Sequence, residues 1–174
     1  MNKIPMTASG YEQLQEELKK LVNEDRPNII AAIAEARSHG DLSENAEYQY
    51  AKEQQSLIEG KIQELESATA LAEIIDVTTL SGKEILFGTT VEIRDDETSD
   101  LSTYQIVGEY ESDIENKKLS VNSPLARGLI GKVKNEVVEI SSPKGLIGKT
   151  KDDVVEIKSP KGIKSYTVLS VKFK

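Results

Sequence analysis

The stretch Ala34-Glu-Ala-Arg37-Ser-His-Gly-Asp41-Leu-Ser-Glu44-Asn-Ala-Glu47-Tyr48 separates two long segments with helical periodicity and decides how they are arranged. Its centre, residues 38–43, combines glycine with short polar side chains and interrupts the apolar pattern, which is typical of a turn. If the chain reverses there, the flanking segments run antiparallel. The sequence therefore predicts a helical hairpin whose tip comprises residues 38–47.

The segment before this turn has apolar residues at intervals of three and four, the spacing of one helical face. They are Tyr11, Leu14, Leu18, Leu21, Val22, Ile29, Ile30 and Ile33. The pattern predicts a helix from Thr7 to about Arg37. Pro27 lacks an amide hydrogen and crowds the carbonyl of Asn23, so we expect a kink or short break near Asp25.

The segment after the turn, Glu44 to Ile75, contains no proline and a single glycine. Its predicted apolar face consists of Ala51, Ile58, Ile62, Leu65, Leu71 and Ala72. Chain reversal brings Leu18 level with Ile62 and Leu14 level with Leu65, so the two apolar stripes pack together. This arrangement predicts an antiparallel coiled coil with arms of about 45 Å.

Beyond Asp76 the apolar period changes to two, and β-branched residues alternate with turn residues, which is typical of strands. The predicted strands are Ile85–Ile93, Thr103–Val107, Leu119–Val121, Val137–Ile140, Val154–Ile157 and Tyr166–Phe173. The fold class predicted from these patterns is α+β, with a helical domain at residues 1–76 and a small antiparallel sheet domain at 77–174.

The sheet domain contains a tandem duplication. Residues 128–144 recur as residues 145–161, with 13 of 17 positions identical. Two units are too few for a solenoid, which needs at least three to bury a core. We therefore expect one copy to occupy the core sheet and the other to form an extra edge hairpin or loop.

Charge is segregated along the chain. Residues 1–76 carry 15 acids and 7 bases, residues 77–116 carry 10 and 2, and residues 117–174 carry 5 and 13. The acidic body excludes nucleic-acid binding over the whole surface, whereas the basic C-terminal third suits an acidic partner, a phosphate backbone or simple solvation.

Composition narrows the class of protein further. The chain has no cysteine, which excludes disulfides, thiolate zinc sites and a cysteine nucleophile. Its first residues lack the apolar core of a signal peptide, and its longest apolar run, residues 29–34, is too short to span a bilayer. We expect a cytoplasmic protein with no membrane partner.

The predicted tip carries three carboxylates, Asp41, Glu44 and Glu47. Asp41 followed three residues later by Glu44 is a capping-box pattern, which favours a structural role at the start of the second helix. Alternatively, two carboxylates at the end of a long hairpin suit a hard cation such as Mg²⁺. Two acids bind Mg²⁺ weakly, so a partner's active site would have to complete the coordination shell.

Other residues near the tip have both a structural and a functional interpretation. Arg37 and Lys52 lie on either side of the turn. They are either solvated residues of the helices or contacts for a phosphate group. Tyr48 and Tyr50 close the apolar seam or offer a stacking face for a base. His39, the only histidine, accompanies no recognisable nucleophile motif, which favours a surface turn residue.

Several segments together resemble the Gre family of bacterial transcript cleavage factors. They are Arg26-Pro-x-Ile29-Ile30, the tip block quoted above, Ile58-Glu-Gly60-Lys-Ile62, Tyr104-Gln-Ile-Val-Gly108, and Ser120-Val-Asn-Ser-Pro124-Leu-Ala-Arg-Gly-Leu-Ile-Gly-Lys132. The resemblance extends in order over nearly the whole chain. It implies a coiled-coil N-terminal domain and an FKBP-like C-terminal domain.

The resemblance also implies a partner and a function. Proteins of this family insert the coiled coil into the secondary channel of backtracked bacterial RNA polymerase, near the extruded RNA 3′ end. Asp41 and Glu44 match the tip acids that help hold the second Mg²⁺ in the polymerase active centre, where two metals promote attack of water on the RNA. The factor alone is then not an enzyme, and it has no tightly bound cofactor of its own.

Further site residues follow from the same resemblance. Arg37 and Lys52 match basic positions that steer the RNA end, and Lys52 stands where arginine is also found. The loop Asn122-Ser123-Pro124 and the basic C-terminal third match the surface that docks at the channel rim. The sequence departs from the family in its duplication, which makes the C-terminal domain one repeat longer.

Three alternatives remain at this stage. One is a factor that enters the channel without stimulating cleavage, which the intact Asp41/Glu44 pair disfavours. Another is a peptidyl-prolyl isomerase, whose pocket needs an aromatic lining. The aromatic residues of the sheet domain are only Phe87, Tyr104, Tyr110, Tyr166 and Phe173. An adapter or holdase for unrelated partners is disfavoured by the specific tip block.

Overall fold

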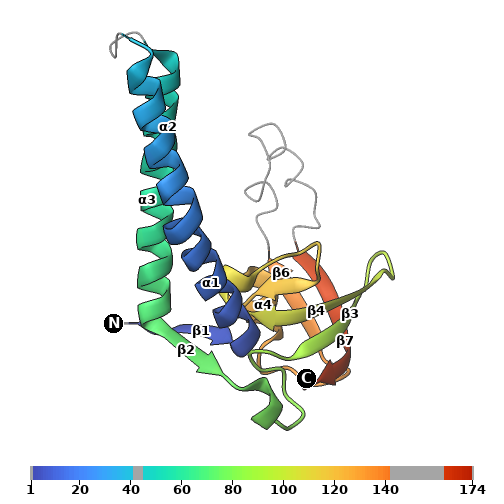
Figure 1. Cartoon of the computed structure of the whole chain (residues 1–174). Coiled ribbons are helices and arrows are strands. Elements are labelled where there is room, and N and C mark those ends of the chain that lie inside the picture. Colours follow the sequence, from blue (N-terminus) through green and yellow to red (C-terminus); the bar gives the residue numbers. More distant parts are fainter. Residues whose placement is uncertain (1, 41–44, 142–162, 174) are drawn as a thin grey trace. The chain divides into compact units, whose positions relative to one another are not determined.

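The structure is a computed structural model that describes residues 2–40, 45–141 and 163–173 (Figure 1). Its helices and strands, in chain order, are β1 (Ile4–Thr7), α1 (Ala8–Lys20), a π-helical turn (Leu21–Asp25), α2 (Arg26–Ser38), α3 (Ala46–Leu71), β2 (Ala72–Ile75), a 3-10 turn (Val77–Thr79), β3 (Thr90–Asp95), β4 (Leu101–Val107), a second 3-10 turn (Glu109–Glu111), β5 (Lys118–Ser120), α4 (Pro124–Leu129), β6 (Val137–Ser141) and β7 (Ile163–Lys172). They form a helical unit (Met1–Ile4 and Ala8–Ile74) and a sheet unit (Pro5–Thr7 and Ile75–Lys174).

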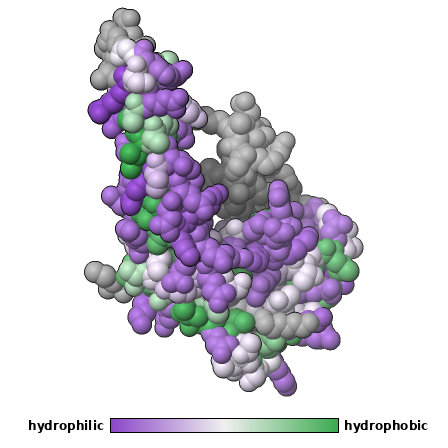
Figure 2. Space-filling model, viewed as in Figure 1, coloured by the Kyte–Doolittle hydropathy of each residue, from purple (hydrophilic) through white to green (hydrophobic). Residues whose placement is uncertain are grey.

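The helical unit is the predicted hairpin. α2 and α3 lie side by side (Figure 1), and α3, at 26 residues, is about 39 Å long. The seam buries Leu14, Ile33, Ile62 and Leu65, which confirms these members of the predicted apolar faces. Ile30, which the spacing also placed on the apolar face, is 51% exposed, so its assignment was wrong. The visible surface of the hairpin is largely hydrophilic with scattered apolar patches (Figure 2), as expected for helices that bury one stripe each.

The first arm is interrupted where the proline predicts it. A π-helical turn, Leu21–Asp25, precedes α2, and Pro27 lies in the first turn of α2. Amides in the first turn of a helix have no hydrogen-bond partner within that helix, so proline is tolerated there. Next to this break, the Nε and Nη2 atoms of Arg26 donate hydrogen bonds of 2.7 Å to the two carboxylate oxygens of Glu59. This hydrogen bonding lowers the pKa of Glu59 from its usual value, and the pair ties α2 to α3 at the break.

The second arm differs from its prediction at both ends. α3 begins at Ala46 rather than Glu44, because Asn45 is its N-cap, and it ends at Leu71 rather than Ile75. The last four residues, Ala72–Ile75, are extended and form β2, which pairs with β1 in a two-stranded sheet. The helical apolar spacing therefore continues past the end of the helix. The backbone of residues 72–75 forms its hydrogen bonds by strand pairing and not within a helix.

The sheet unit is a five-stranded sheet in the order β5-β4-β3-β7-β6. The pairs β3–β4, β3–β7 and β6–β7 are antiparallel, as predicted. β4 and β5 are parallel, with Ile106 opposite Leu119. Parallel neighbours need a crossover connection, and residues 108–117, which include the second 3-10 turn, provide it in this chain.

The first copy of the duplication contributes to the core of the sheet unit. Leu129 from α4 and Val138 and Ile140 from β6 are buried there with residues of β3, β4, β5 and β7. The burial of these three residues supports the expectation that residues 128–144 form the copy that occupies the core sheet. The second copy, residues 145–161, lies outside the described residues, and so does the predicted strand Val154–Ile157 within it.

The strand predicted from Ile85 begins only at Thr90. Ile85 is nevertheless fully buried, in a loop whose backbone is fixed by hydrogen bonds. The Ile85 amide donates to the Lys132 carbonyl at 2.8 Å, and the Gly131 amide donates to the Ile85 carbonyl at 2.8 Å. Apolar character thus predicted burial correctly but the strand boundary incorrectly.

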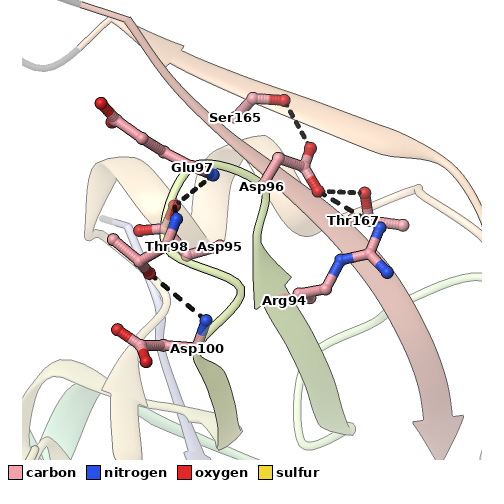
Figure 3. Close-up of polar contacts among 8 residues, drawn as sticks. All are labelled: Arg94, Asp95, Asp96, Glu97, Thr98, Asp100, Ser165 and Thr167. Atoms are coloured by element: carbon pink, nitrogen blue, oxygen red, sulfur yellow. Dashed lines mark hydrogen bonds and ion pairs between the residues drawn. The ribbon is translucent and has the colours of Figure 1, made fainter.

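The β3–β4 turn is stabilised by side chains of β7 (Figure 3). The Asp96 carboxylate accepts hydrogen bonds from the hydroxyls of Thr167, at 2.6 Å, and Ser165, at 2.8 Å. An Arg94 guanidinium nitrogen lies 3.5 Å from the same carboxylate. These contacts stabilise the ionised carboxylate and so lower the pKa of Asp96 from its usual value. The hydrogen bond from Thr167 makes the largest contribution.

Candidate functional site

The candidate site is the connection between α2 and α3. Asp41 and Glu44 fall between Ser38, where α2 ends, and Ala46, where α3 begins. Both lie outside the described residues. The geometry of the site is therefore given by the described residues on either side, which are 37–40 and 45–52.

Asn45 connects the two helices at this end of the hairpin. Its side-chain oxygen accepts a hydrogen bond of 3.1 Å from the Tyr48 amide, which caps α3. Its side-chain nitrogen donates 2.6 Å to the carbonyl of Ala36, in the last turn of α2. The expectation that Asp41 caps the second helix is therefore wrong, since Asn45 occupies that position and reaches both helices.

One of the three tip carboxylates already has a partner. A Glu47 carboxylate oxygen lies 3.1 Å from Nδ1 of His39, across the connection, and both side chains are exposed. Glu47 also lies in the first turn of α3, where the helix dipole favours an acid. His39 is thus a surface residue of the turn, as its isolation in the sequence indicates. The other two acids, Asp41 and Glu44, lie outside the described residues.

A basic and aromatic face lies beside the connection. The guanidinium carbon of Arg37 is 5.7 Å from the ring centroid of Tyr48, within cation–π range. Lys52 lies four residues after Tyr48, so the two share one face of α3. The Lys52 side chain is exposed, and its ammonium donates a hydrogen bond of 3.2 Å to the side-chain oxygen of Gln55. The structure therefore brings Arg37 and Tyr48 into contact and places Lys52 one turn further along.

Tyr50 does not close the apolar seam. Its side chain is 64% exposed, whereas Tyr48 is half-buried under Arg37. The seam at this end is filled instead by the small side chains of Ala36 and Ala51. The two tyrosines differ because residues two apart on a helix point in different directions.

The predicted loop Asn122-Ser123-Pro124 lies in the sheet unit at the start of α4. The Ser123 hydroxyl accepts a 3.1 Å hydrogen bond from the Ala126 amide and caps this helix, with Pro124 in its first turn. Asn122 is exposed, and its side-chain nitrogen donates 3.3 Å to Glu109. The loop therefore has a defined structural role, and Asn122 and Pro124 also present exposed surface.

The residue that sequence reasoning missed is Asn45. Asparagine immediately before a first turn that contains an acid, here Glu47, is an N-cap signal, and it competed with the capping-box pattern that begins four residues earlier. Among the described residues, no group of three or more histidine, aspartate or glutamate side chains is arranged to hold a metal ion. Asp41 and Glu44 are not among those residues. In the same described ranges, no helix has the length and apolar character needed to cross a membrane.

Comparison with known proteins defines the class. The N-terminal family model for transcription elongation factors matches residues 4–74, and the model for the GreA/GreB C-terminal domain matches residues 80–146. These two models cover most of the chain, in the order that the fold shows. The protein belongs to the GreA/GreB family of transcription elongation factors.

Its relatives within this family carry the name GreA. The chain is 56% identical to transcription elongation factor GreA of Caulobacter vibrioides (strain NA1000 / CB15N) over 143 residues, which is 82% of this chain and 91% of the relative. It is 50% identical to GreA of Maricaulis maris (strain MCS10) over 173 residues, 99% of each chain. The crystal structure of GreA factor homolog 1 of Thermus thermophilus aligns with 98% of this chain and 99% of its own, at 22% identity and a TM-score of 0.41.

Proposed function

We propose that this protein enters the secondary channel of bacterial RNA polymerase and stimulates the polymerase to cleave backtracked RNA. The observation that carries the proposal is the helical hairpin of a GreA/GreB family member, with two acids in its connection. Chemistry is performed by the polymerase, and the factor supplies carboxylates at a position that the hairpin reaches. On this proposal the protein acts in the cytoplasm and is not an enzyme by itself.

Asp41 and Glu44 are the groups proposed to act in cleavage. Their carboxylate oxygens are of the kind that Mg²⁺ prefers, and Glu47 is already paired with His39. Two carboxylates fill only part of an octahedral shell, so the ion would be held jointly with the polymerase and not by the factor alone. A metal in that position lowers the pKa of bound water and stabilises charge that develops on phosphate oxygens.

The residues around the acids are proposed to hold the RNA and to orient the tip. Arg37, stacked over Tyr48, and the exposed ammonium of Lys52 supply positive charge for phosphates at the RNA 3′ end. Asn45, which directly follows Glu44 in the chain, joins α2 to α3 through its hydrogen bonds to Ala36 and Tyr48. In the sheet unit, Asn122, Ser123 and Pro124 are proposed to contact the rim of the channel.

A cleavage assay tests this proposal. Stalled, backtracked polymerase carrying end-labelled RNA is mixed with wild-type protein, Asp41→Ala/Glu44→Ala or Glu53→Ala, each at equal folded concentration. Glu53→Ala is the matched control, because it removes an exposed acid of α3 away from the connection. We expect rapid shortening of the RNA with the wild type and Glu53→Ala, and none with the double variant, although polymerase binding is retained.

The opposite outcomes are equally informative. If the wild type binds polymerase and shortens no RNA, the protein is a channel-binding regulator without cleavage stimulation. If the double variant cleaves as fast as the wild type, the tip acids are not the metal-holding groups. Binding is measured separately by competition for polymerase, so that loss of docking is distinguished from loss of chemistry.

A further inference from the structure

A surface pocket of about 510 Å³ lies within the sheet unit, and its lining does not include the loop Asn122-Ser123-Pro124. It is lined by Gly82, Lys83, Val133, Lys134, Ser170, Val171 and Lys172. These residues come from the loop before β3, the turn between α4 and β6, and the end of β7. The pocket is therefore assembled from three segments that only the fold brings together.

Backbone hydrogen bonds hold the walls of this pocket in place. The loop that carries Lys83 is joined to the α4–β6 turn by the bonds between Ile85 and residues 131–132 described above. The turn that carries Lys134 is joined to β7, because the Asn135 amide donates 2.8 Å to the Val168 carbonyl and the Val168 amide donates 3.0 Å to Glu136. The pocket is thus largely pre-formed, which is usual for small-ligand sites.

The charge of the lining is unlike that of the whole protein. The chain has a net charge of -8, yet this pocket is lined by three lysines and no acid. Within residues 2–40, 45–141 and 163–173, no carboxylate forms an ion pair with Lys83, Lys134 or Lys172. The carboxylate of the neighbouring Glu136 instead accepts a hydrogen bond of 2.9 Å from the Val133 amide. Lysines that line one pocket and have no carboxylate partner give it a positive charge, which favours an anion there.

The remaining lining indicates the kind of anion. Val133 and Val171 are half-buried and give the pocket an apolar wall, and the Ser170 hydroxyl adds a hydrogen-bonding group. The volume lies within the range of small-molecule sites, and a concave surface suits a small ligand better than a flat protein face. Lysine ammoniums bind phosphate groups as point charges, and several lysines match a ligand with several negative charges.

We propose that this pocket binds the phosphate groups of a free nucleotide, with the sugar and base lying against the apolar wall. The lining contains no aromatic side chain, so the base is not held by stacking and the phosphates dominate recognition. This inference goes beyond RNA cleavage, which needs no small ligand in the sheet unit. It gives the sheet unit a nucleotide-binding site in addition to its proposed docking role.

Isothermal titration calorimetry on the full-length protein tests the proposal with three probes, which are GTP, inorganic pyrophosphate and guanosine. We expect GTP and pyrophosphate to bind one per chain, guanosine not to bind, and added salt to weaken the binding. The variant Lys83→Gln/Lys134→Gln/Lys172→Gln is expected to lose about tenfold or more in affinity for GTP, because three charges are removed. Lys117→Gln, an exposed lysine of the same unit outside the lining, is the matched control and should bind as the wild type does.

A second measurement does not depend on any variant. In the wild-type protein, GTP is expected to shift the amide NMR signals of Lys83, Lys134 and Ser170 along one saturable curve. An RNA oligonucleotide with a 5′-hydroxyl end forms a separate arm, because it carries backbone phosphates but no polyphosphate. The proposal is wrong if GTP gives no saturable binding at millimolar concentration, if Lys117→Gln weakens binding as much as the triple variant, or if only the oligonucleotide binds this pocket.

Discussion

The carboxylate of Glu111 accepts hydrogen bonds from both the amide and the hydroxyl of Thr7, a residue 104 positions earlier in the chain. The amide bond is 3.0 Å long, and the Gly108 amide donates a further 2.9 Å bond to the same carboxylate. Glu111 is only 7% exposed. A buried charge is thus fully satisfied, and residues 5–7 of β1 belong to the sheet unit rather than to the helices that follow them.

Glu111→Gln is predicted to destabilise the sheet unit by about 1.5–3 kcal/mol, the usual contribution of a hydrogen bond to a charged group. Both backbone amides donate to Oε2 and the Thr7 hydroxyl donates to Oε1. Glutamine can place its carbonyl oxygen at the Oε2 position, but its NH2 group then faces the Thr7 hydroxyl, so the hydrogen bond from that hydroxyl and the negative charge are both lost. Urea unfolding measures the change, with Glu115→Gln, an exposed acid of the same unit, as the control. Equal stability of the Glu111 variant and the wild type would show that these hydrogen bonds contribute nothing.

Asn45→Ala is predicted to destabilise the helical hairpin by about 0.5–2 kcal/mol, because it removes the N-cap of α3. It also removes the 2.6 Å bond to Ala36, so RNA cleavage should slow even where the protein remains folded. Far-UV circular dichroism during urea unfolding reports the first effect, and the cleavage assay reports the second. Gln49→Ala, an exposed change in the same helix, should alter neither. A hairpin unaffected by Asn45→Ala would contradict the bridging role.

The contribution of Asp96 to stability is predicted to depend on pH. Its pKa in the folded protein is lowered, the Thr167 hydrogen bond being the largest cause, so the ionised carboxylate stabilises the fold. This contribution is fully present above the pKa of the unfolded chain, about 3.9, and is lost as the pH falls through the folded-state value. Asp96→Asn should therefore lower the Tm at pH 7, and the gap to the wild type should narrow below about pH 4.

Asp100→Asn is the control for the Asp96 experiment, since Asp100 is an exposed acid of the same turn. It should leave the Tm near that of the wild type at every pH. A gap between Asp96→Asn and the wild type that stays constant from pH 7 to pH 3 would show that the effect is not electrostatic.

Deleting either copy of the duplication is predicted to leave a folded protein. The buried residues of the first copy, Leu129, Val138 and Ile140, have identical counterparts in the second. The chains that lack residues 128–144 or residues 145–161 differ from each other at only four positions. We expect both to melt cooperatively at similar temperatures, since each retains one set of core residues. An unfolded protein after deletion of residues 128–144 would refute the hypothesis that one copy is enough.

Point substitutions distinguish the two copies within the full chain. Val138→Asp places a carboxylate in the core of the sheet unit, where an unpaired charge is strongly unfavourable. Val155→Asp makes the same change in the second copy. If the first copy alone fills the core, as the described residues show for Val138, only Val138→Asp lowers the Tm strongly. Equal effects of the two substitutions would show that both copies contribute to the fold.

Much of this protein follows from local patterns. Apolar spacing of three and four predicted the hairpin, and Leu14, Ile62 and Leu65 are buried as that spacing requires. Pro27 predicted the break in the first arm. These predictions succeed because helical periodicity and proline geometry depend on residues within a few positions of one another. The resemblance of the tip block to the family could also be seen in the sequence alone, because the block is one contiguous stretch.

The candidate site was predicted in part. Arg37 and Lys52 lie beside the connection, as their positions in the sequence require, but the choice of Asp41 as the cap was wrong. Asp41 and Asn45 are both capping signals, and the residues near them do not show which one caps α3. The hydrogen bond from Asn45 to Ala36 favours Asn45, and this bond forms only once the two helices are packed together.

Other features depend entirely on tertiary structure. The parallel pairing of β4 with β5, the buried contact of Thr7 with Glu111, and the convergence of Lys83, Lys134 and Lys172 join residues far apart in the chain. Such contacts depend on chain topology, and many topologies satisfy the same alternation of apolar residues. The amino-acid pattern therefore determines where the helices and most of the strands form, while packing of the whole sheet decides which distant polar groups meet.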